Sequence, residues 1–367
     1  MKILALPNAL KGSLSARRAG QIFQRILSPK HTVRTHPVCD GGDGLLDFFK
    51  ALDPQAKTVF VTAKNAFLKN KRTSFLLLSD GKTAVLETAQ ICGLGSAKKC
   101  DLDPLGASSY GVGQVLQAAV KHGAKTIYIG LGGVACNDGG AGMATACGAK
   151  LSDKNGRPIL PGAKPLLKLY RIDLTALKTH FNSVRLIGIA DVKNPLLGPL
   201  GSARIFGPQK GAGPKQVKVL EQALSRWAAV LQKETGKNFS HTPSTGAAGA
   251  IAAGLYAAFG ARLCLGTEQL FKEAHLEKQI AWADLIITCE GKLDTQTFYG
   301  KAPGAVLRLA KKYRKPVLFI CGQLDSAVLR RKNLPALQIA TLLDFAKNET
   351  DAKKHAAKII RRVLANL

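Results

Sequence analysis

The sequence predicts an α/β protein of two domains, in which both termini build one doubly wound parallel sheet and a mixed α/β domain is inserted between them. Strand and helix patterns alternate at both ends of the chain, whereas the middle contains closely spaced strands. The chain has 367 residues, which exceeds the usual size of a single domain. We expect the first domain to comprise residues 1–65 and 283–367, and the inserted domain to comprise residues 66–282.

The N-terminal residues alternate between strand and helix patterns. The apolar run KILALP ends at Pro7, and the segment SLSARRAGQIFQRIL after it repeats apolar residues at helical spacing. TVRTHPV predicts a second strand, and the loop CDGGDG leads from it into a helix through Leu45 and Leu52. Because strand–helix–strand units place their strands in parallel, this end of the chain predicts a parallel sheet.

The middle of the chain changes to a pattern of hairpins. TVFVT, TSFLLL and KTAVLE follow one another closely, and Asp80-Gly81 between the last two is typical of a hairpin turn. A helix around Tyr110 to Val120, the strand TIYIG, a glycine-rich loop and the strand VRLIGIAD come next. The uncharged segment TGAAGAIAAGLYAAFGA is too short and too weakly apolar for a membrane span, so it predicts a close-packed buried helix.

The C-terminal residues return to the pattern of the N-terminal ones. LIITCE, PVLFICG and LQIAT predict three strands. A helix from Lys301 to Tyr313 lies between the first two, and a further helix ends the chain. Two matching ends around a different middle favour an inserted domain.

Composition limits the classes of partner. The 53 Lys and Arg residues against 24 Asp and Glu give a net charge of +29, which favours anionic partners from nucleic acid to phosphorylated metabolites. The basic residues are dispersed and aromatic residues make up only 6%, so we expect no specific nucleic-acid surface.

The eight cysteines show no C-x-x-C pairing, which indicates neither a zinc site nor a disulfide framework and favours a reducing cytoplasm. No secretory signal follows Met1, and we expect no membrane partner.

Loops rich in glycine, acids and lysine follow most of the predicted strands. They are PNALKGS, CDGGDG, GLGGVACNDGG, ADVKNPLLG and CEGKLDTQT, and GPQKGAG is a further lysine loop. The carboxyl ends of parallel strands and clefts between domains are common ligand sites. Phosphoryl transfer needs an anion cradle, carboxylate-held Mg²⁺, lysines and a residue that accepts the hydroxyl proton. Since these loops supply all four, they predict a phosphotransferase.

A dinucleotide-dependent dehydrogenase is an alternative. GLGGVA fits G-x-G-x-x-A after a strand, and Asp153 follows about twenty residues later, as in dinucleotide-binding folds. Against it, Asn137 and Asp138 stand where the helix of that motif is normally apolar, and hydride transfer gives no reason for acids and lysines in the other loops. Each loop alone also suits an ordinary turn or helix cap.

In these loops the chain resembles the type-1 glycerate kinase family of bacteria, from Met1 to near the C-terminus. The family patterns P-D-S-x-K-x-S-L-S-A, D-G-G-E-G and G-x-G-G-S-A-T-N-D-G-G-A-G correspond to PNALKGSLSA, DGGDG and GLGGVACNDGGAG. C-D-V-x-N-P-L-x-G, F-G-P-Q-K-G-A and G-E-G-R-L-D-x-Q-T-x-x-G-K-x-P correspond to ADVKNPLLG, FGPQKGA and CEGKLDTQTFYGKAP. The resemblance implies ATP-dependent phosphorylation of D-glycerate to 2-phosphoglycerate with Mg²⁺. It also implies one flavodoxin-like domain and one domain similar to restriction endonucleases.

The loops provide candidates for each role in the reaction. Asp191, at the end of a predicted strand, is the candidate base for the glycerate hydroxyl, and the other catalytic candidates are Lys11, Asp294 and Lys292. The substrate-binding candidates are Ser13, Ser15, Asn194, Ser108 and Ser109. The candidates for nucleotide or phosphate binding, including the cradle expected in residues 130–142, are Gly132, Gly133, Asn137, Gly139, Gly140, Lys210 and Lys301. The candidate metal ligands are Asp43, Asp138 and Glu290. Mg²⁺ usually takes one or two carboxylates, so some of these acids must be structural.

Several positions depart from the family patterns. Asn8 and Ala9 replace an Asp and a Ser, and Val134 and Cys136 replace a Ser and a Thr. Leu102 stands where an Arg is common. A second alternative is therefore a catalytically impaired relative that only binds a nucleotide or metabolite. The sequence leaves open whether the chain is a monomer or a homodimer.

Overall fold

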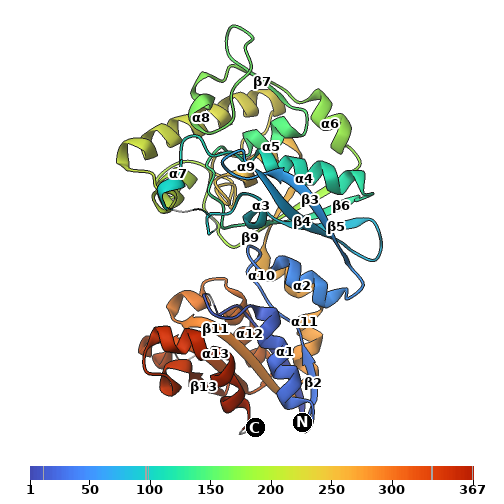
Figure 1. Cartoon of the computed structure of the whole chain (residues 1–367), viewed down its shortest axis with the longest axis vertical. Helices are drawn as coiled ribbons and strands as arrows, with labels where there is room; N and C mark the ends of the chain where they lie inside the picture. The colour runs from blue at the N-terminus through green and yellow to red at the C-terminus, as the bar shows by residue number, and fades with distance from the viewer. Residues whose placement is uncertain (11, 96, 98, 332–333, 366) are drawn as a thin grey trace. The chain divides into compact units, whose positions relative to one another are not determined.

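The computed structural model describes residues 1–10, 12–95, 97, 99–331, 334–365 and 367. The chain divides into two compact units (Figure 1). Unit 1 comprises residues 1–40, 47–54 and 266–367, and unit 2 comprises residues 41–46 and 55–265. Each unit has its own main sheet and helices.

Unit 1 is built on a five-stranded parallel sheet. The strands are β1 (Lys2–Pro7), β2 (Thr32–Thr35), β11 (Leu285–Leu293), β12 (Val317–Leu324) and β13 (Leu337–Thr341). Their order is β13-β12-β11-β1-β2, with parallel pairing throughout. Counted within the unit, this is the order 2-1-3-4-5 of flavodoxin-like doubly wound sheets. The strand order reverses between β1 and β11, which makes the carboxyl ends of these two strands the topological switch point.

Helices surround the sheet of unit 1. They are α1 (Ala16–Leu27), α2 (Leu45–Leu52, of which the first two residues are grouped with unit 2), α10 (Gly266–Glu273), α11 (Leu276–Trp282), α12 (Ala302–Lys312) and α13 (Glu349–Leu364). Short 3₁₀ helices cover Thr295–Phe298, Ser326–Arg330 and Leu342–Phe345. Helices α1 and α13 contact each other and share a buried core with strands β1, β11 and β12, to which Phe23, Ile3, Ile287, Ile320 and Ile360 contribute.

Unit 2 is built on a six-stranded mixed sheet. The strands are β3 (Lys57–Lys64), β4 (Asn70–Leu77), β5 (Thr83–Glu87), β6 (Thr126–Leu131), β9 (Arg185–Ala190) and β10 (Arg262–Leu265), in the order β10-β9-β6-β5-β4-β3. The pairs β3–β4 and β4–β5 are antiparallel. The pairs β5–β6, β6–β9 and β9–β10 are parallel. Strands β7 (Lys150–Ser152) and β8 (Arg171–Asp173) form a separate antiparallel pair.

The helices of unit 2 are mostly short. They are α3 (Thr88–Cys92), α4 (Tyr110–Lys121), α5 (Ala141–Ala146), α6 (Thr175–Phe181), α7 (Ser202–Phe206), α8 (Pro214–Thr235) and α9 (Ile251–Ala258), with 3₁₀ helices at Lys99–Asp101, Lys164–Lys168 and Pro208–Lys210. Helix α8 was not predicted, although Pro214 stands at its first position and Gly236 directly follows its end, as is common for helices. Its residues Leu220, Leu224, Trp227 and Leu231 share one buried face.

The predicted α/β class with parallel strands is confirmed, as are the strand and helix patterns at both ends of the chain. The predicted hairpin at Asp80-Gly81 joins β4 and β5. The side chain of Asp80 fixes this turn, because its Oδ1 accepts hydrogen bonds of 2.8 Å from the backbone N–H groups of Lys82 and Thr83. Among the described residues, no helix combines the length and the apolar character that a membrane crossing requires.

The boundaries of the compact units differ from the predicted domain boundaries. Residues 57–64 were expected in the first domain, but they form β3, which pairs along its full length with β4 and so belongs to unit 2. Residues 266–282 were expected in the inserted domain, but α11 contacts β1 and α12 and so belongs to unit 1. Strand pairing therefore determines the first boundary, and helix packing determines the second.

The predicted helix in TGAAGAIAAGLYAAFGA is shorter than expected. Helix α9 covers only Ile251–Ala258, and the residues before it form turns with positive φ at Ala248, Gly249 and Ala250. A close backbone approach explains the bend, because a Cβ on Gly249 would lie 2.0 Å from the carbonyl oxygen of Cys136. Gly249 also accepts a hydrogen bond of 3.2 Å from the N–H of Gly139. The segment therefore bends to pack against the glycine-rich loop.

Candidate functional site

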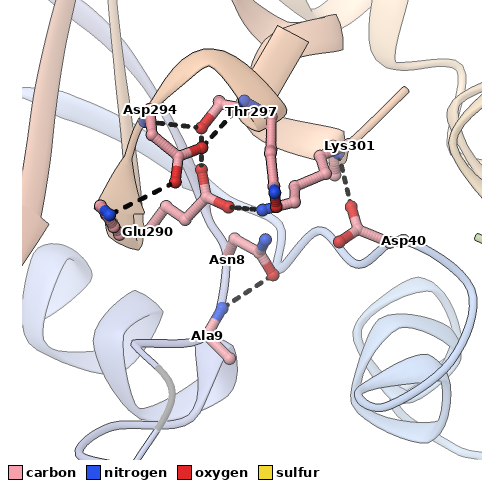
Figure 2. A network of polar contacts seen from close by, with 10 residues as sticks. Asn8, Ala9, Asp40, Glu290, Asp294, Thr297 and Lys301 are labelled. Atoms are coloured by element: carbon pink, nitrogen blue, oxygen red, sulfur yellow. Dashed lines mark hydrogen bonds and ion pairs between the residues drawn. The ribbon is translucent and has the colours of Figure 1, made fainter. Parts of the chain in front are cut away.

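A network of polar side chains lies at the topological switch point of unit 1 (Figure 2). Glu290, in β11, is 7% exposed. Its Oε1 accepts a hydrogen bond of 3.2 Å from Lys301 Nζ, and its Oε2 accepts one of 2.8 Å from Thr297 Oγ1. Burial raises the pKa of Glu290, while Lys301 and Thr297 oppose that rise. Both oxygens of this carboxylate are therefore held in place by other side chains of unit 1.

Asp40 connects this network to a helix. Its Oδ1 accepts a hydrogen bond of 2.5 Å from the N–H of Ala302, the first residue of α12. A carboxylate at a helix N-terminus is favoured by the helix dipole. The negative charge of Asp40 also contributes to the raised pKa of Glu290, so the two carboxylates act on each other.

Asn8 directly follows β1, and Figure 2 shows its side chain bonded to Ala9. Its N–H donates to the carbonyl oxygen of Cys289 at 3.2 Å, and its side-chain Oδ1 accepts from the N–H of Ala9 at 2.8 Å. The amide carries no charge. An uncharged amide therefore stands at the end of β1, where the family pattern has an Asp.

The other candidates in unit 1 take part in local contacts. Asp294 caps the 3₁₀ helix after it, because its Oδ1 accepts from the N–H of Gln296 at 2.9 Å. Lys292 Nζ lies 3.9 Å from Asp294 Oδ2, with the lysine side chain 56% exposed. Exposed ion pairs of this kind contribute little stability. The catalytic roles of both residues stay predictions.

The candidates in the loop after β1 are bonded to the protein. Ser13 Oγ donates to the carbonyl oxygen of Lys353 at 2.6 Å. Ser15 is the N-cap of α1, because its Oγ accepts from the N–H of Arg18 at 3.2 Å. Their roles in substrate binding stay predictions. Lys11 lies outside the described residues.

In unit 2, the register of two parallel strands brings Asp191 to the start of the glycine-rich loop. Leu131 ends β6 and Ala190 ends β9, and these two residues pair with each other. Gly132 and Asp191 therefore follow neighbouring strands at the same edge of the sheet. Asp191 is exposed. After it, Asn194 Nδ2 donates to the carbonyl oxygen of Leu200 at 2.8 Å, which fixes the side chain of Asn194 within its own loop.

Asp43 reaches the same edge of the sheet. A Cβ on Gly133 would lie 3.3 Å from Asp43 Oδ1, and both residues are exposed. The loop that carries Asp43 is held by Glu87, the last residue of β5, whose Oε1 accepts from the N–H of Leu46 at 2.9 Å. Glu87 is only 6% exposed. Glu87 is not among the residues predicted from the sequence, although an acid at the end of the apolar run KTAVLE is a signal for it.

Close packing explains the glycines of the loop at residues 130–142. A Cβ on Gly130 would lie 3.0 Å from two backbone carbonyl oxygens of the loop that carries Asp43. A Cβ on Gly139 would lie 2.7 Å from Trp227 Cδ1, and one on Gly142 would lie 2.2 Å from Ser108 Oγ. Residues 134–144 are buried, whereas Gly132 is half-buried and Gly133 is exposed. Only the start of the loop is therefore accessible to a ligand.

The later N–H groups of the loop have partners within the protein. The N–H of Gly139 donates to Gly249, and the N–H groups of Gly140 and Gly142 donate to the carboxylate of Asp138. Gly132, at the start, donates a longer bond of 3.4 Å to Thr88 Oγ1. Phosphate binding by Gly139 and Gly140 stays a prediction that these contacts do not support, and the accessible candidates are Gly132 and Gly133.

Asn137 and Lys210 hold the middle of the loop. Lys210 is 2% exposed, and its Nζ donates to the carbonyl oxygen of Cys136 at 2.7 Å and to Asn137 Oδ1 at 3.0 Å. Asn137 Nδ2 donates to the carbonyl oxygen of Pro104 at 3.1 Å. Burial lowers the pKa of Lys210 to about 8. Lys210 is thus bonded to protein groups, and its role in phosphate binding stays a prediction.

Ser108, Ser109 and Asp138 are all fully buried. Both serine hydroxyls donate to Asp138 Oδ2, at 3.1 Å from Ser108 and 3.0 Å from Ser109. Substrate binding by the serines and metal binding by Asp138 stay predictions. Among the residues that the structure describes, no group of three or more His, Cys, Asp or Glu side chains is arranged to hold a metal ion.

Comparison with known proteins gives a consistent result over the full chain. The sequence profile described as the glycerate kinase family matches residues 3–367. The chain is 38% identical over 327 residues to a glycerate kinase of Halalkalibacterium halodurans, covering 88% of this chain and 85% of that protein. It is 37% identical over 376 residues to a glycerate 2-kinase of Escherichia coli K12, covering 100% and 98%. A crystal structure assigned to glycerate kinase 2 of Salmonella typhimurium LT2 matches with a TM-score of 0.84 and 34% identity, covering 100% and 96%.

The packing around Gly142 predicts a destabilised variant. In Gly142→Ala the new methyl group would collide with Ser108 Oγ and would lie 2.8 Å from both Asp138 Oδ2 and the N atom of Tyr110. We expect a loss of about 1–3 kcal/mol in the free energy of unfolding, as for other overpacked sites, measured by urea denaturation. Gly95→Ala is the matched control, because a Cβ there has no atom within 4 Å. Equal stability of the two variants would contradict the packing argument.

The lowered pKa of Lys210 predicts a pH-dependent stability. The folded protein binds this proton less tightly than the unfolded chain, so the unfolded state carries more protons between about pH 8 and the ordinary lysine pKa of 10.5. Stability therefore increases as pH rises through this window. We expect the unfolding free energy of the wild type, relative to Lys210→Met, to rise by on the order of 3 kcal/mol between pH 7 and pH 10.5. A difference that is flat across denaturation curves in this range would refute the assignment.

Proposed function

We propose that this chain, which belongs to the glycerate kinase family, transfers the γ-phosphoryl group of ATP to D-glycerate and releases 2-phosphoglycerate. The family makes it a kinase, and the substrate is carried over from relatives that the chain matches along nearly their full length. The observation that carries the proposal is the edge of the unit 2 sheet where Asp191 and Asp43 accompany the accessible start of the glycine-rich loop.

Asp191 is the proposed base. A residue that takes the proton of a substrate hydroxyl must be accessible, ionised and within hydrogen-bond reach of that hydroxyl. Asp191 is exposed and follows β9, next to the strand that leads into Gly132. Asn194 lies in the same loop and has its side chain fixed. These features support proton transfer at a position set by the sheet.

Asp43 is the carboxylate that best fits a magnesium ligand. It is exposed and adjacent to Gly133, and Mg²⁺ in kinases needs only one or two carboxylates because waters and substrate phosphates fill its other positions. When bound, Mg²⁺ would offset charge that develops on the transferred phosphoryl group. Glu290 fits less well, because Thr297 and Lys301 occupy its oxygens.

The network at the switch point of unit 1 is a separate candidate for ligand binding within that unit. In doubly wound sheets, ligands bind outside the carboxyl ends of the strands at this point. Lys301 is 34% exposed there and provides a positive charge for a phosphate or carboxylate group.

Because all eight cysteines are free thiols, we also keep the prediction of a reducing cytoplasm.

Of the two alternatives from the sequence, one is excluded and the other is open to a test. A dinucleotide-dependent dehydrogenase is excluded by membership of a kinase family. A catalytically impaired relative stays an alternative, and replacement of Asn8 by the Asp of the family pattern tests it.

The proposed reaction is tested by a coupled assay for ADP with D-glycerate and MgATP. We expect turnover that depends on all three components, and ³¹P NMR of the product should show the phosphate ester at the 2-position. Formation of 3-phosphoglycerate would correct the position of transfer. The absence of turnover with D-glycerate and with other small hydroxy acids would refute the proposal.

Replacement of Asp191 tests the proposed base. We expect Asp191→Asn to lower kcat by about 10²–10⁴-fold, the usual contribution of a general base, while the Kd for ATP stays close to that of the wild type. Asp153→Asn is the matched control, because Asp153 is a half-buried carboxylate of unit 2 whose Oδ1 accepts turn hydrogen bonds from Asn155 and Arg157. Similar kcat values for the wild type and Asp191→Asn would remove Asp191 from the mechanism.

Replacement of Asn8 separates an active kinase from an impaired one. We expect Asn8→Asp to change kcat by less than about tenfold, because the proposed base Asp191 and the proposed Mg²⁺ ligand Asp43 are both present without it. Initial rates at saturating D-glycerate and MgATP provide the measurement. An increase of several orders of magnitude would instead favour the impaired relative.

A further inference from the structure

We propose that Asp138 is a positioning residue which, together with Ser108 and Ser109, fastens the glycine-rich loop for phosphoryl transfer. We call these three residues the Asp138 junction. The inference rests on the proposed function, because catalysis is one of its readouts. It assigns Asp138 and both serines to a role different from the metal binding and substrate binding that the sequence predicted.

The buried carboxylate of Asp138 accepts five hydrogen bonds from the protein. Oδ2 accepts from the N–H of Ser109 at 2.7 Å, from Ser109 Oγ at 3.0 Å, from Ser108 Oγ at 3.1 Å and from the N–H of Gly142 at 3.2 Å. Oδ1 accepts from the N–H of Gly140 at 3.3 Å. A carboxylate offers about four lone-pair sites. Since five donors already point at it and its exposed fraction is 0%, a Mg²⁺ ion would have to displace them.

The junction replaces a missing helix cap. The N-cap of α5 is Gly140, which has no side chain. Helix N-termini leave several N–H groups without partners, and a side-chain oxygen normally accepts from them. Here Asp138 accepts from Gly142, while Ser109 Oγ accepts from the N–H of Met143 at 2.9 Å and donates to Asp138. The first turn of α5 is thereby bonded to the segment that precedes α4.

Two buried charges hold consecutive residues of the loop. Lys210 Nζ bonds the carbonyl oxygen of Cys136 and the side chain of Asn137, and Asp138 comes next in the chain. Neither charged group is ion-paired with the other, yet the negative charge of Asp138 favours the charged form of Lys210. Burying a charge is costly unless hydrogen bonds compensate it. The fully bonded Asp138 and Lys210 therefore leave this segment little freedom to move.

The start of the loop is fastened independently. Thr88 Oγ1 donates to the carbonyl oxygen of Gly130 at 2.8 Å, and the N–H of Leu94 donates to Gly133 at 2.7 Å. With the Asp138 junction at its other end, the loop is held along its length and leaves Gly132 and Gly133 accessible. Backbone groups that are fixed before the reaction stabilise a transition state more effectively than mobile ones. This is how a buried residue would affect phosphoryl transfer without touching the substrate.

The experiment compares Asp138→Asn, Ser109→Ala and the double variant. The amide of Asp138→Asn would keep only one acceptor oxygen. Its NH₂ group would face the N–H and O–H donors that now bond the carboxylate. We expect kcat/KM for D-glycerate to fall by at least about tenfold in Asp138→Asn, with a smaller loss in Ser109→Ala. The losses should be strongly non-additive in the double variant, since both changes open one junction. The Mg²⁺ concentration for half-maximal rate should stay within about threefold of the wild-type value, because the Mg²⁺ carboxylates lie elsewhere.

Amide hydrogen exchange provides a readout that does not depend on activity. We expect faster exchange of the N–H groups of Gly140, Gly142 and Met143 in Ser109→Ala, the variant least disruptive to folding, because their partners are lost or loosened. Leu177→Ala is the matched control for lost stability alone, since Leu177 is a fully buried apolar residue of unit 2 in α6. It should lower the Tm without changing kcat/KM or the exchange of these three groups.

Three results would overturn the proposal. A rise of at least about tenfold in the half-saturating Mg²⁺ concentration for Asp138→Asn would make Asp138 a metal ligand. A lower Tm with unchanged kcat/KM in Asp138→Asn and Ser109→Ala would make the junction merely structural. Unchanged exchange in Ser109→Ala would show that the junction does not hold the loop. If the wild type lacks glycerate turnover, the proposed function fails, and the exchange data still decide whether the junction fastens the loop.

Discussion

The parallel pairing of β6 with β9 is the constraint on which the candidate site of unit 2 depends. Because Leu131 and Ala190 end these strands as partners, the residues after them emerge at one edge without any further device. The glycine-rich loop and Asp191 come from segments about sixty residues apart in the sequence, and only the register of the sheet relates them. Asp43 joins them through the loop held by Glu87.

The glycines of the loop serve close packing more than ligand binding. In the sequence, six glycines in thirteen residues indicated bare backbone for a phosphate. In the structure, Gly130, Gly139 and Gly142 give space to a neighbouring backbone, an indole ring and a serine hydroxyl. A loop that packs this tightly has few alternative conformations, because protein interiors resist small shifts. Packing and function are compatible here, since a rigid loop keeps its accessible start in a fixed place.

Sequence patterns predicted the elements well where they depend on local periodicity. The strands and helices at both termini, the Asp80 turn and the loops after the strands are examples. Patterns failed where a distant partner decides the structure. Nothing near Asp40 indicates that it caps α12, 262 residues away, and nothing near Ser109 indicates a bond to Asp138. The turn before α9 likewise depends on the carbonyl oxygen of Cys136. Such partners follow from tertiary packing, which overrides local propensity.

Few charged side chains are buried in this strongly basic protein. Among the residues that the structure describes, three carboxylates are buried, namely Glu87, Asp138 and Glu290, and one lysine is buried, Lys210. Each is bonded to groups in the loops at the carboxyl ends of the parallel strands. Burial of a charge without partners would be costly. The hydrogen bonds of these four side chains therefore hold the loops around them in one conformation. The net charge of +29 favours anionic partners over longer range, while the buried charges hold the loops in shape.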